Sequence, residues 1–173
     1  MDASDALLAG FADYYIPQER WPELIENLIE TGDWSVIDSM AGDPPDGRLM
    51  GQRDRIDSDF AGVSAADIWR GLGDDDFAEE TKAAISKNCP LSVACAVELV
   101  RRVRAFERIQ PALDMEFRFT YRSASDGDFI EGIRALIIDK DRNPRWSHPD
   151  VLSVPHMDVV NMLRPLGDEK LKF

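Results

Sequence analysis

Apolar residues recur at helical spacing along most of the chain, and this pattern predicts a mainly α protein. The pattern is strongest in residues 128–146, which read DFIEGIRALIIDKDRNPRW. One apolar stripe in this stretch comprises Phe129, Ile130, Ile133, Leu136 and Ile137. Asp128 can accept the free amide hydrogens of a first helical turn, and Pro144 can end the run because it has no amide hydrogen. We therefore expect a buried helix that begins after Asp128 and carries charged residues at its C-terminal end.

Similar apolar stripes, with capping residues beside them, predict helices in the rest of the chain. The expected helices are a first one capped by Ser4 or Asp5, residues 19–30 ending at Gly32, a short one capped by Asp33, one around Ile56 and Phe60, one capped by Ser64, one opened by Asp76, one from Cys89-Pro90 to about Phe106, residues 110–124 and residues 157–163.

One short run departs from the helical pattern. Tyr14, Tyr15 and Ile16 form a β-prone segment that Pro17 closes, so we expect one short strand near Tyr15. We find no partner strand for it in the sequence, and a lone strand leaves its backbone amides unpaired. The segment would therefore need a sheet edge that lies outside this sequence.

A turn-rich loop, Gly42 to Gly47, interrupts the helical pattern. We divide the chain accordingly into residues 1–41, a flexible loop at 42–51 and a helical region at 52–173. No apolar run approaches the length of a membrane span, and we find no signal-peptide pattern at the start, so we expect a cytoplasmic chain with no membrane partner.

The net charge of −13 is confined to the first half of the chain. Residues 1–87 hold 20 acidic and 7 basic residues, whereas residues 88–173 hold 13 of each. An acidic chain repels the phosphate backbone, which argues against a nucleic-acid partner. The neutral half can still bind a small phosphate-bearing ligand through a local basic patch.

Two groups of basic residues could form such a patch. Lys140, Arg142 and Arg145 follow the expected helix and suit phosphate, although they could instead pair with Asp139 and Asp141 in solvent. The second group is Arg101, Arg102, Arg104 and Arg108. A solvated helix face explains this second group better than a guanidinium cradle for an acidic partner.

The remaining candidate residues give no catalytic or metal site. His148 and His156 lack a carboxylate or cysteine at ligand spacing, and we expect both to be exposed. Cys89 and Cys95 lie six residues apart, which matches neither a metal knuckle nor a redox pair, so we expect buried, reduced thiols.

Residues 128–146 also resemble the C-terminal signature of the 3-hydroxyisobutyryl-CoA hydrolases, a branch of the enoyl-CoA hydratase/isomerase (crotonase) superfamily. Glu131-Gly132 and Asp139-Lys140 are similar to the pattern that ends many crotonases, and Pro144-Arg145-Trp146 is more particular to the hydrolase branch. Residues 5–17 (DALLAGFADYYIP) and 115–122 (MEFRFTYR) extend the resemblance over nearly the whole chain.

The resemblance implies the helical C-terminal portion of a crotonase-like fold in a homo-oligomer. It also implies an acyl-CoA substrate, hydrolysed in valine breakdown, whose coenzyme A phosphates meet Lys140, Arg142 and Arg145. The family places its oxyanion hole and catalytic carboxylates in an N-terminal spiral that no position here matches. We therefore assign no catalytic residue and no tightly bound cofactor, and we expect this chain alone not to be catalytically competent.

Three hypotheses follow. The chain is a fragment of an acyl-CoA enzyme, a separate subunit that completes a partner carrying the N-terminal half, or a stand-alone helical interaction module. Either half-enzyme should expose apolar residues between Asp5 and Ile16 and bury them by association. An enoyl-CoA hydratase or isomerase remains the alternative to a hydrolase within the superfamily.

Overall fold

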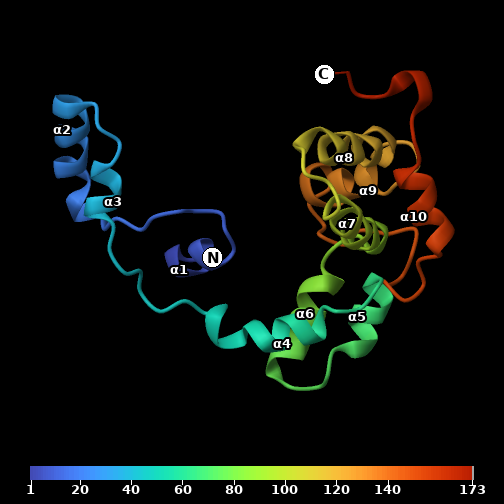
Figure 1. Cartoon of the computed structure of the whole chain (residues 1–173). Coiled ribbons are helices and arrows are strands. Elements are labelled where there is room, and N and C mark those ends of the chain that lie inside the picture. The colour runs from blue at the N-terminus through green and yellow to red at the C-terminus, as the bar shows by residue number, and fades with distance from the viewer. Residues whose placement is uncertain (173) are drawn as a thin grey trace. The chain divides into compact units, whose positions relative to one another are not determined.

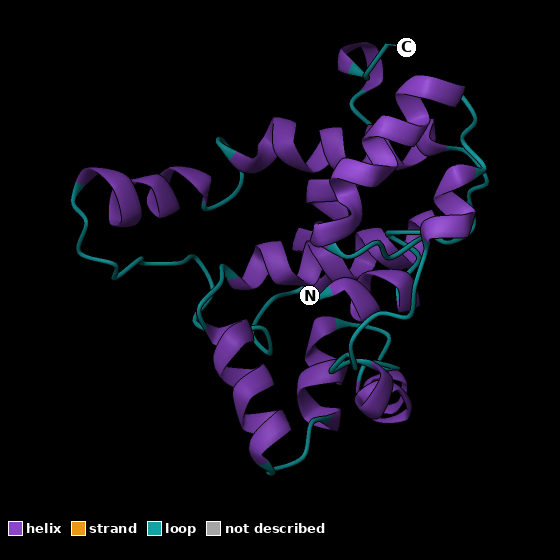
Figure 2. Ribbon diagram, turned by 90° about the vertical axis from the view of Figure 1, so that its left-hand side faces the viewer, coloured by secondary structure: helices purple, strands orange, loops and turns teal. Residues whose placement is uncertain are grey.

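The computed structural model describes residues 1–172, and these residues form helices and loops without a β-strand (Figures 1 and 2). The chain divides into two compact units, Met1–Ser58 and a second one that begins at Asp59. The predicted mainly α class is confirmed. The predicted boundaries of the 42–51 loop, and its flexibility, stay predictions.

The first unit contains short helices joined by long loops. They are α1 (Ala3–Leu8), η1 (Gln18–Arg20), α2 (Trp21–Thr31), α3 (Val36–Met40), η2 (Met50–Gln52) and most of α4 (Arg53–Asp59). Helix α2 ends as predicted at Gly32, whose φ of 64° lies in the left-handed region that glycine adopts without strain. Helix α3 packs beside α2, and Arg20 donates to the Met40 carbonyl oxygen at 3.0 Å.

The predicted strand near Tyr15 is wrong. The Tyr15 carbonyl oxygen accepts a hydrogen bond from the Gly42 amide at 2.9 Å, and the Ile16 carbonyl oxygen accepts one from the Trp21 indole at 2.9 Å. These two hydrogen bonds give the carbonyl oxygens of Tyr15 and Ile16 a donor each, so the segment needs no hydrogen-bonded neighbour strand. Within the predicted apolar segment, Phe11 and Tyr14 are exposed.

The N-terminal cap of α1 also differs from the prediction. The Asp2 carboxylate, rather than Ser4 or Asp5, accepts from a first-turn amide, that of Asp5, at 2.9 Å. The Asp5 carboxylate is buried and accepts from the Leu49 amide at 2.9 Å. Asp5 therefore fastens the 42–49 loop to α1 instead of capping the helix.

The second unit contains the larger helices. They are α5 (Ala65–Gly71), α6 (Asp76–Ser86), α7 (Pro90–Val103), α8 (Ile109–Ser123), α9 (Phe129–Ile133), η3 (Arg134–Ile138), α10 (His156–Leu163) and η4 (Gly167–Glu169). Helices α7, α8 and α10 contact one another and supply the core (Figure 1). The buried core residues are Leu91, Cys95, Met115, Val159, Met162 and Leu163.

Capping residues begin two of these helices. The Ser64 hydroxyl accepts from the Asp67 amide at 3.1 Å, which confirms the predicted cap of α5. Helix α6 is capped by Asp75, one residue earlier than the predicted opening. Gly62 lies against α5 so closely that a Cβ there would be 2.6 Å from the Ile68 backbone nitrogen.

Helix α8 holds the end of α10 through two arginines. Arg122 is 7% exposed and donates to the carbonyl oxygens of Met162 at 3.0 Å, Arg164 at 2.7 Å and Pro165 at 3.2 Å. Arg118 donates to the Leu163 carbonyl oxygen at 3.4 Å. The last carbonyls of a helix lack partners within it, so these guanidinium groups supply the missing donors.

Within residues 1–172, no single helix is both long and apolar enough to cross a membrane. Helices α6 and α7 together satisfy the length and composition criteria for a span, but the chain bends by 110° between them.

Candidate functional site

Residues 128–146 form a short helix, a wide turn and a loop instead of the single helix predicted. Helix α9 is followed by the π turn η3, which closes when the Asp139 amide donates to the Arg134 carbonyl oxygen at 2.8 Å. A π turn holds one more residue than an α turn, so it shifts the helical stripe. Ala135 is buried, whereas Leu136, Ile137 and Ile138 are exposed, so the predicted buried helix is wrong.

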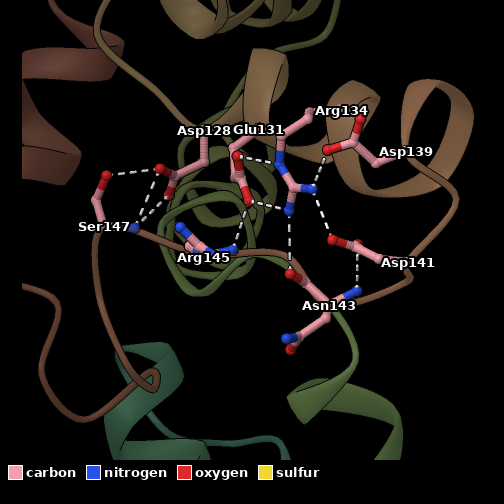
Figure 3. Close-up of polar contacts among 8 residues, drawn as sticks. All are labelled: Asp128, Glu131, Arg134, Asp139, Asp141, Asn143, Arg145 and Ser147. Atoms are coloured by element: carbon pink, nitrogen blue, oxygen red, sulfur yellow. Dashed lines mark hydrogen bonds and ion pairs between the residues drawn. The ribbon is translucent and has the colours of Figure 1, made fainter.

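Asp128 precedes α9 but does not cap it. Its carboxylate accepts from the Ser147 hydroxyl at 2.6 Å and from the Ser147 amide at 3.1 Å (Figure 3). The Cys89 thiol donates to the same carboxylate at 3.3 Å. The predicted capping role is wrong because these groups occupy the carboxylate. Asp128 instead fastens the returning end of the loop.

Arg134 is the centre of a polar network that shapes this loop (Figure 3). Its guanidinium meets the Glu131 carboxylate twice, at 2.7 and 2.9 Å. Its Nη1 also donates to Asp139 at 2.6 Å and to Asp141 at 2.7 Å, and its Nη2 donates to the Asn143 carbonyl oxygen at 3.1 Å. One guanidinium therefore joins the Glu131 carboxylate of α9 to two carboxylates and a backbone carbonyl oxygen of the loop.

The network fixes the charges of its members. The hydrogen bonds from Arg134, followed by that from the Arg145 amide at 2.7 Å, lower the pKa of Glu131 from 4.5 to about 2. Arg134, followed by the Asn143 amide, lowers the pKa of Asp141, and the three carboxylates raise the pKa of Arg134. Glu131, Asp141 and Arg134 are therefore charged at neutral pH, which keeps their hydrogen bonds intact there.

The loop has an unusual backbone at two of the predicted ligand residues. Lys140 has a φ of 56° and Arg142 a φ of 53°, values that residues other than glycine, asparagine and aspartate rarely adopt. The Arg142 amide donates to the Ala135 carbonyl oxygen at 3.0 Å, and the Asn143 amide donates to Asp141 at 2.9 Å. These bonds, with those of Arg134, hold the left-handed residues in place.

The structure places the predicted ligand residues Lys140, Arg142 and Arg145 on this one loop, with all three exposed. Their side chains make no hydrogen bond or ion pair with other residues that the structure describes. The alternative prediction was a solvated group that pairs with Asp139 and Asp141. The three side chains are solvated, and the ion pairs to both carboxylates come from Arg134. Sequence reasoning had not assigned Arg134 a role, although its acidic neighbours at positions 131, 139 and 141 were visible.

An apolar groove of about 810 Å³ lies beside the loop. It runs between α7, α8 and α9, and most of its lining is apolar. Its lining residues include Cys89, Leu91, Phe119, Gly132, Ile133, Ala135, Leu136, Arg142, Pro144, Trp146 and Met162. Arg142 is thus an unpaired cation on the wall of an apolar groove.

The histidines differ from the prediction in part. His156 is exposed as expected, whereas the His148 side chain is only 15% exposed and its Nε2 lies 3.0 Å from the Asp158 carboxylate. The predicted exposure of His148 is therefore wrong, because the side chain packs beside Asp158. Asp158 lies in α10, and the spacing of ten residues matched no known ligand or catalytic pattern.

The second basic group is largely solvated, as expected. Arg104 and Arg108 are exposed, Arg102 pairs with Glu98 at 2.7 Å, and Arg101 donates to the Gly62 carbonyl oxygen at 3.2 Å. The Arg101 bond ties α7 to the loop at Gly62, whereas the Arg102–Glu98 pair lies within α7. The four arginines form no convergent cradle among the described residues.

The cysteines are both free thiols. Cys95 is buried as predicted, and burial raises its pKa to about 12, whereas Cys89 is only half-buried. Among residues 1–172, no cluster of three or more histidine, cysteine or acidic side chains could hold a metal ion.

Comparison with known proteins identifies the family of this chain. Residues 1–163 match the family model for enoyl-CoA hydratase/isomerase. Mitochondrial 3-hydroxyisobutyryl-CoA hydrolases are similar to 98% of the chain, at 30% identity in Gallus gallus and 32% in Mus musculus. In both cases the match covers 47% of the relative, so the chain spans about half the length of the curated relatives it matches.

Solved structures show the same likeness. A crystal structure of an enoyl-CoA hydratase from Rhodobacter sphaeroides is 42% identical, with a TM-score of 0.90 over all of this chain and 50% of the other. A carnitinyl-CoA dehydratase from Mycobacterium thermoresistibile is 30% identical, with a TM-score of 0.85 over 98% of this chain and 49% of the other. The helical arrangement therefore recurs in enzymes named for CoA thioesters.

Proposed function

Because the chain belongs to the enoyl-CoA hydratase/isomerase family, we propose that it acts on acyl-CoA thioesters as the C-terminal part of a 3-hydroxyisobutyryl-CoA hydrolase-like enzyme. In this role it binds the coenzyme A moiety of a short hydroxyacyl-CoA and supplies packing surface. The similarity to hydrolases over 98% of the chain supports this choice.

One observation carries the proposal. The cationic loop at residues 139–145 presents three unpaired basic side chains, and one of them, Arg142, lines an apolar groove of about 810 Å³. An acyl-CoA has anionic phosphates at one end and a long, mostly uncharged acyl-pantetheine arm at the other. Guanidinium and ammonium groups bind phosphate, and the apolar wall suits the arm.

The exposed apolar side chains of α9 and η3 have a second role in this proposal. Phe129, Ile130, Leu136, Ile137 and Ile138 are all more than half exposed. Apolar surface that large costs free energy in water unless it is covered. We expect it to pack against the N-terminal crotonase half or a neighbouring subunit, in a homo-oligomer.

A second activity has its own support. The structure with 42% identity to this chain is that of an enoyl-CoA hydratase, which is a higher identity than that of the curated hydrolases reported above. The reaction would then be addition of water to an enoyl-CoA double bond instead of thioester cleavage. Both activities use the same coenzyme A contacts.

Calorimetric titration of the protein with coenzyme A and with dephospho-coenzyme A, at two salt concentrations, tests the binding role. We expect coenzyme A to bind more tightly, and Lys140→Ala, Arg142→Ala or Arg145→Ala to weaken it by roughly tenfold, the effect of losing one charge-assisted hydrogen bond. The matched control is Arg104→Ala, which removes an exposed arginine outside this loop. Higher affinity for coenzyme A than for dephospho-coenzyme A assigns the loop to the 3′-phosphate, and equal affinity assigns it to the pyrophosphate. Unchanged affinity in all three loop variants, or an equal loss in the control, would contradict the assignment.

The two activities are separated by their products. The full protein is mixed with 3-hydroxyisobutyryl-CoA while free thiol is followed, and with crotonyl-CoA while loss of the conjugated double bond is followed. Thiol release alone supports the hydrolase, and hydration alone supports the hydratase. Tight coenzyme A binding with neither product supports a binding part that lacks catalytic groups.

A further inference from the structure

Acidic and basic residues alternate along the cationic loop, as Asp139, Lys140, Asp141 and Arg142. The two acidic side chains converge on a single atom of Arg134, at 2.6 and 2.7 Å, while the two basic ones take left-handed backbone conformations. Figure 3 shows the acidic side chains turned toward Arg134. The loop thereby separates its charges: both carboxylates bind Arg134, and the Lys140 and Arg142 side chains make no ion pair with the described residues.

We propose that Arg134 is a positioning residue for phosphate binding, which sequesters Asp139 and Asp141 and so leaves Lys140 and Arg142 free for the ligand. This inference rests on the proposed binding of coenzyme A phosphates. It assigns to Arg134 no contact with the ligand. Glu131, on α9, holds the guanidinium in place by two hydrogen bonds of 2.7 and 2.9 Å. From this fixed position Arg134 acts on the ligand residues through the loop.

The electrostatic part of the argument concerns what happens to the carboxylates without Arg134. The nearest cations left to Asp139 and Asp141 are then Lys140, Arg142 and Arg145, which are the proposed ligand residues. Replacement of Arg134 by glutamine removes one positive charge, and one unit charge about 7 Å from a phosphate in water-like surroundings changes affinity by roughly threefold. Salt reduces the effect, since the screening length is about 8 Å at physiological ionic strength.

The geometric part concerns the backbone. Arg134 bonds to Asp139, Asp141 and the Asn143 carbonyl oxygen, which bracket the two left-handed residues on both sides. Left-handed backbone at a lysine or arginine persists only where neighbouring bonds impose it. Removing the guanidinium therefore releases the loop as well as its carboxylates.

The test compares R134Q with the triple variant R134Q/D139N/D141N by calorimetric titration with coenzyme A. We expect R134Q to weaken binding by at least roughly threefold and the triple variant to regain most of that loss, because amides no longer compete for the cations. The same two aspartate changes without R134Q should improve binding much less. R102Q, which breaks the Arg102–Glu98 pair on α7, is the matched control and should leave affinity unchanged.

A second readout needs no ligand. Trypsin cleaves after lysine and arginine in mobile chain segments, so R134Q should speed cleavage after Lys140 and Arg142, as followed by mass spectrometry, and R102Q should not. Unchanged affinity and unchanged cleavage in R134Q would overturn the inference. A loss of affinity without rescue in the triple variant would overturn the sequestering role.

The two proposals fail in different ways. If the unmodified protein binds neither coenzyme A nor dephospho-coenzyme A, the proposed function fails, and faster cleavage in R134Q still shows that Arg134 holds the loop. If the protein binds coenzyme A through Lys140 and Arg142 but R134Q binds it equally well, the binding role stands and the role of Arg134 falls.

Discussion

Replacement of Arg122 by methionine tests how α8 holds the end of α10. The side chain is 7% exposed, and its guanidinium has no carboxylate in hydrogen-bonding contact among the described residues. Its donors go to the carbonyl oxygens of Met162, Arg164 and Pro165. Methionine has a similar length and is apolar, so Arg122→Met removes the donors without leaving a large cavity.

The size of the effect follows from those three acceptors. The bond to Met162 is fully buried, and leaving that oxygen without a donor costs about 1–3 kcal/mol. The oxygens of Arg164 and Pro165 are partly buried, so water can replace part of each lost bond, at a cost of about 0.5 kcal/mol each. We expect Arg122→Met to lower the free energy of unfolding by about 3 kcal/mol.

Urea unfolding followed by circular dichroism measures this change. With a slope of about 2 kcal/mol per molar urea, the midpoint should fall by about 1.5 M. Arg104→Met is the control, because Arg104 is exposed at the end of α7, and it should change stability by less than about 0.5 kcal/mol. Equal midpoints for the two variants would refute the argument that Arg122 supplies the missing donors of α10.

Three further predictions concern single positions. Gly62→Ala should destabilise the protein by about 1–3 kcal/mol in urea unfolding, because the new Cβ would meet the α5 backbone at 2.6 Å, whereas Gly73→Ala enters open space and should cost under about 0.5 kcal/mol. Folding lowers the pKa of Glu131 from 4.5 to about 2, so the ionised carboxylate stabilises the fold above about pH 4.5, and this stabilisation is lost as the pH falls toward 2. The difference in melting temperature between the wild type and Glu131→Gln should therefore shrink over that pH range. A difference that stays constant would contradict this prediction. At pH 8 Cys95, with its pKa of about 12, should react with a thiol reagent far more slowly than the half-buried Cys89 in the folded protein, and at an equal rate only after unfolding.

Features that depend on residues a few positions apart could be predicted from the sequence. Gly32 ends α2 and Ser64 caps α5 because both effects act within one helical turn. The stripe of α8 placed that helix within one residue of its observed bounds, Ile109–Ser123. These local rules were enough to establish the mainly α class.

Features that depend on distant partners could not be predicted. The segment at Tyr15 has β-prone residues, but the Gly42 amide and the Trp21 indole satisfy its carbonyls, and no local rule identifies either donor. The Asp128 carboxylate accepts hydrogen bonds from Ser147, 19 residues away, instead of from the first turn of α9. Sequence spacing likewise gave no sign of the pair between His148 and Asp158.

The candidate site falls between these cases. The motif drew attention to Lys140, Arg142 and Arg145, and the structure places all three on one exposed loop. Their role in coenzyme A binding stays a prediction. What the sequence did not reveal is that Arg134 takes both acidic neighbours, because that depends on the π turn that ends α9.

The left-handed backbone at Lys140 and Arg142 sets two opposing demands on the amino acid at each position. Conformation alone would select glycine or asparagine there, whereas phosphate binding would select lysine or arginine. If all twenty residues are tested at either position, their order by folding yield should therefore differ from their order by affinity for coenzyme A. Isoleucine and valine, which are uncharged and branched at Cβ, should rank last by both measures.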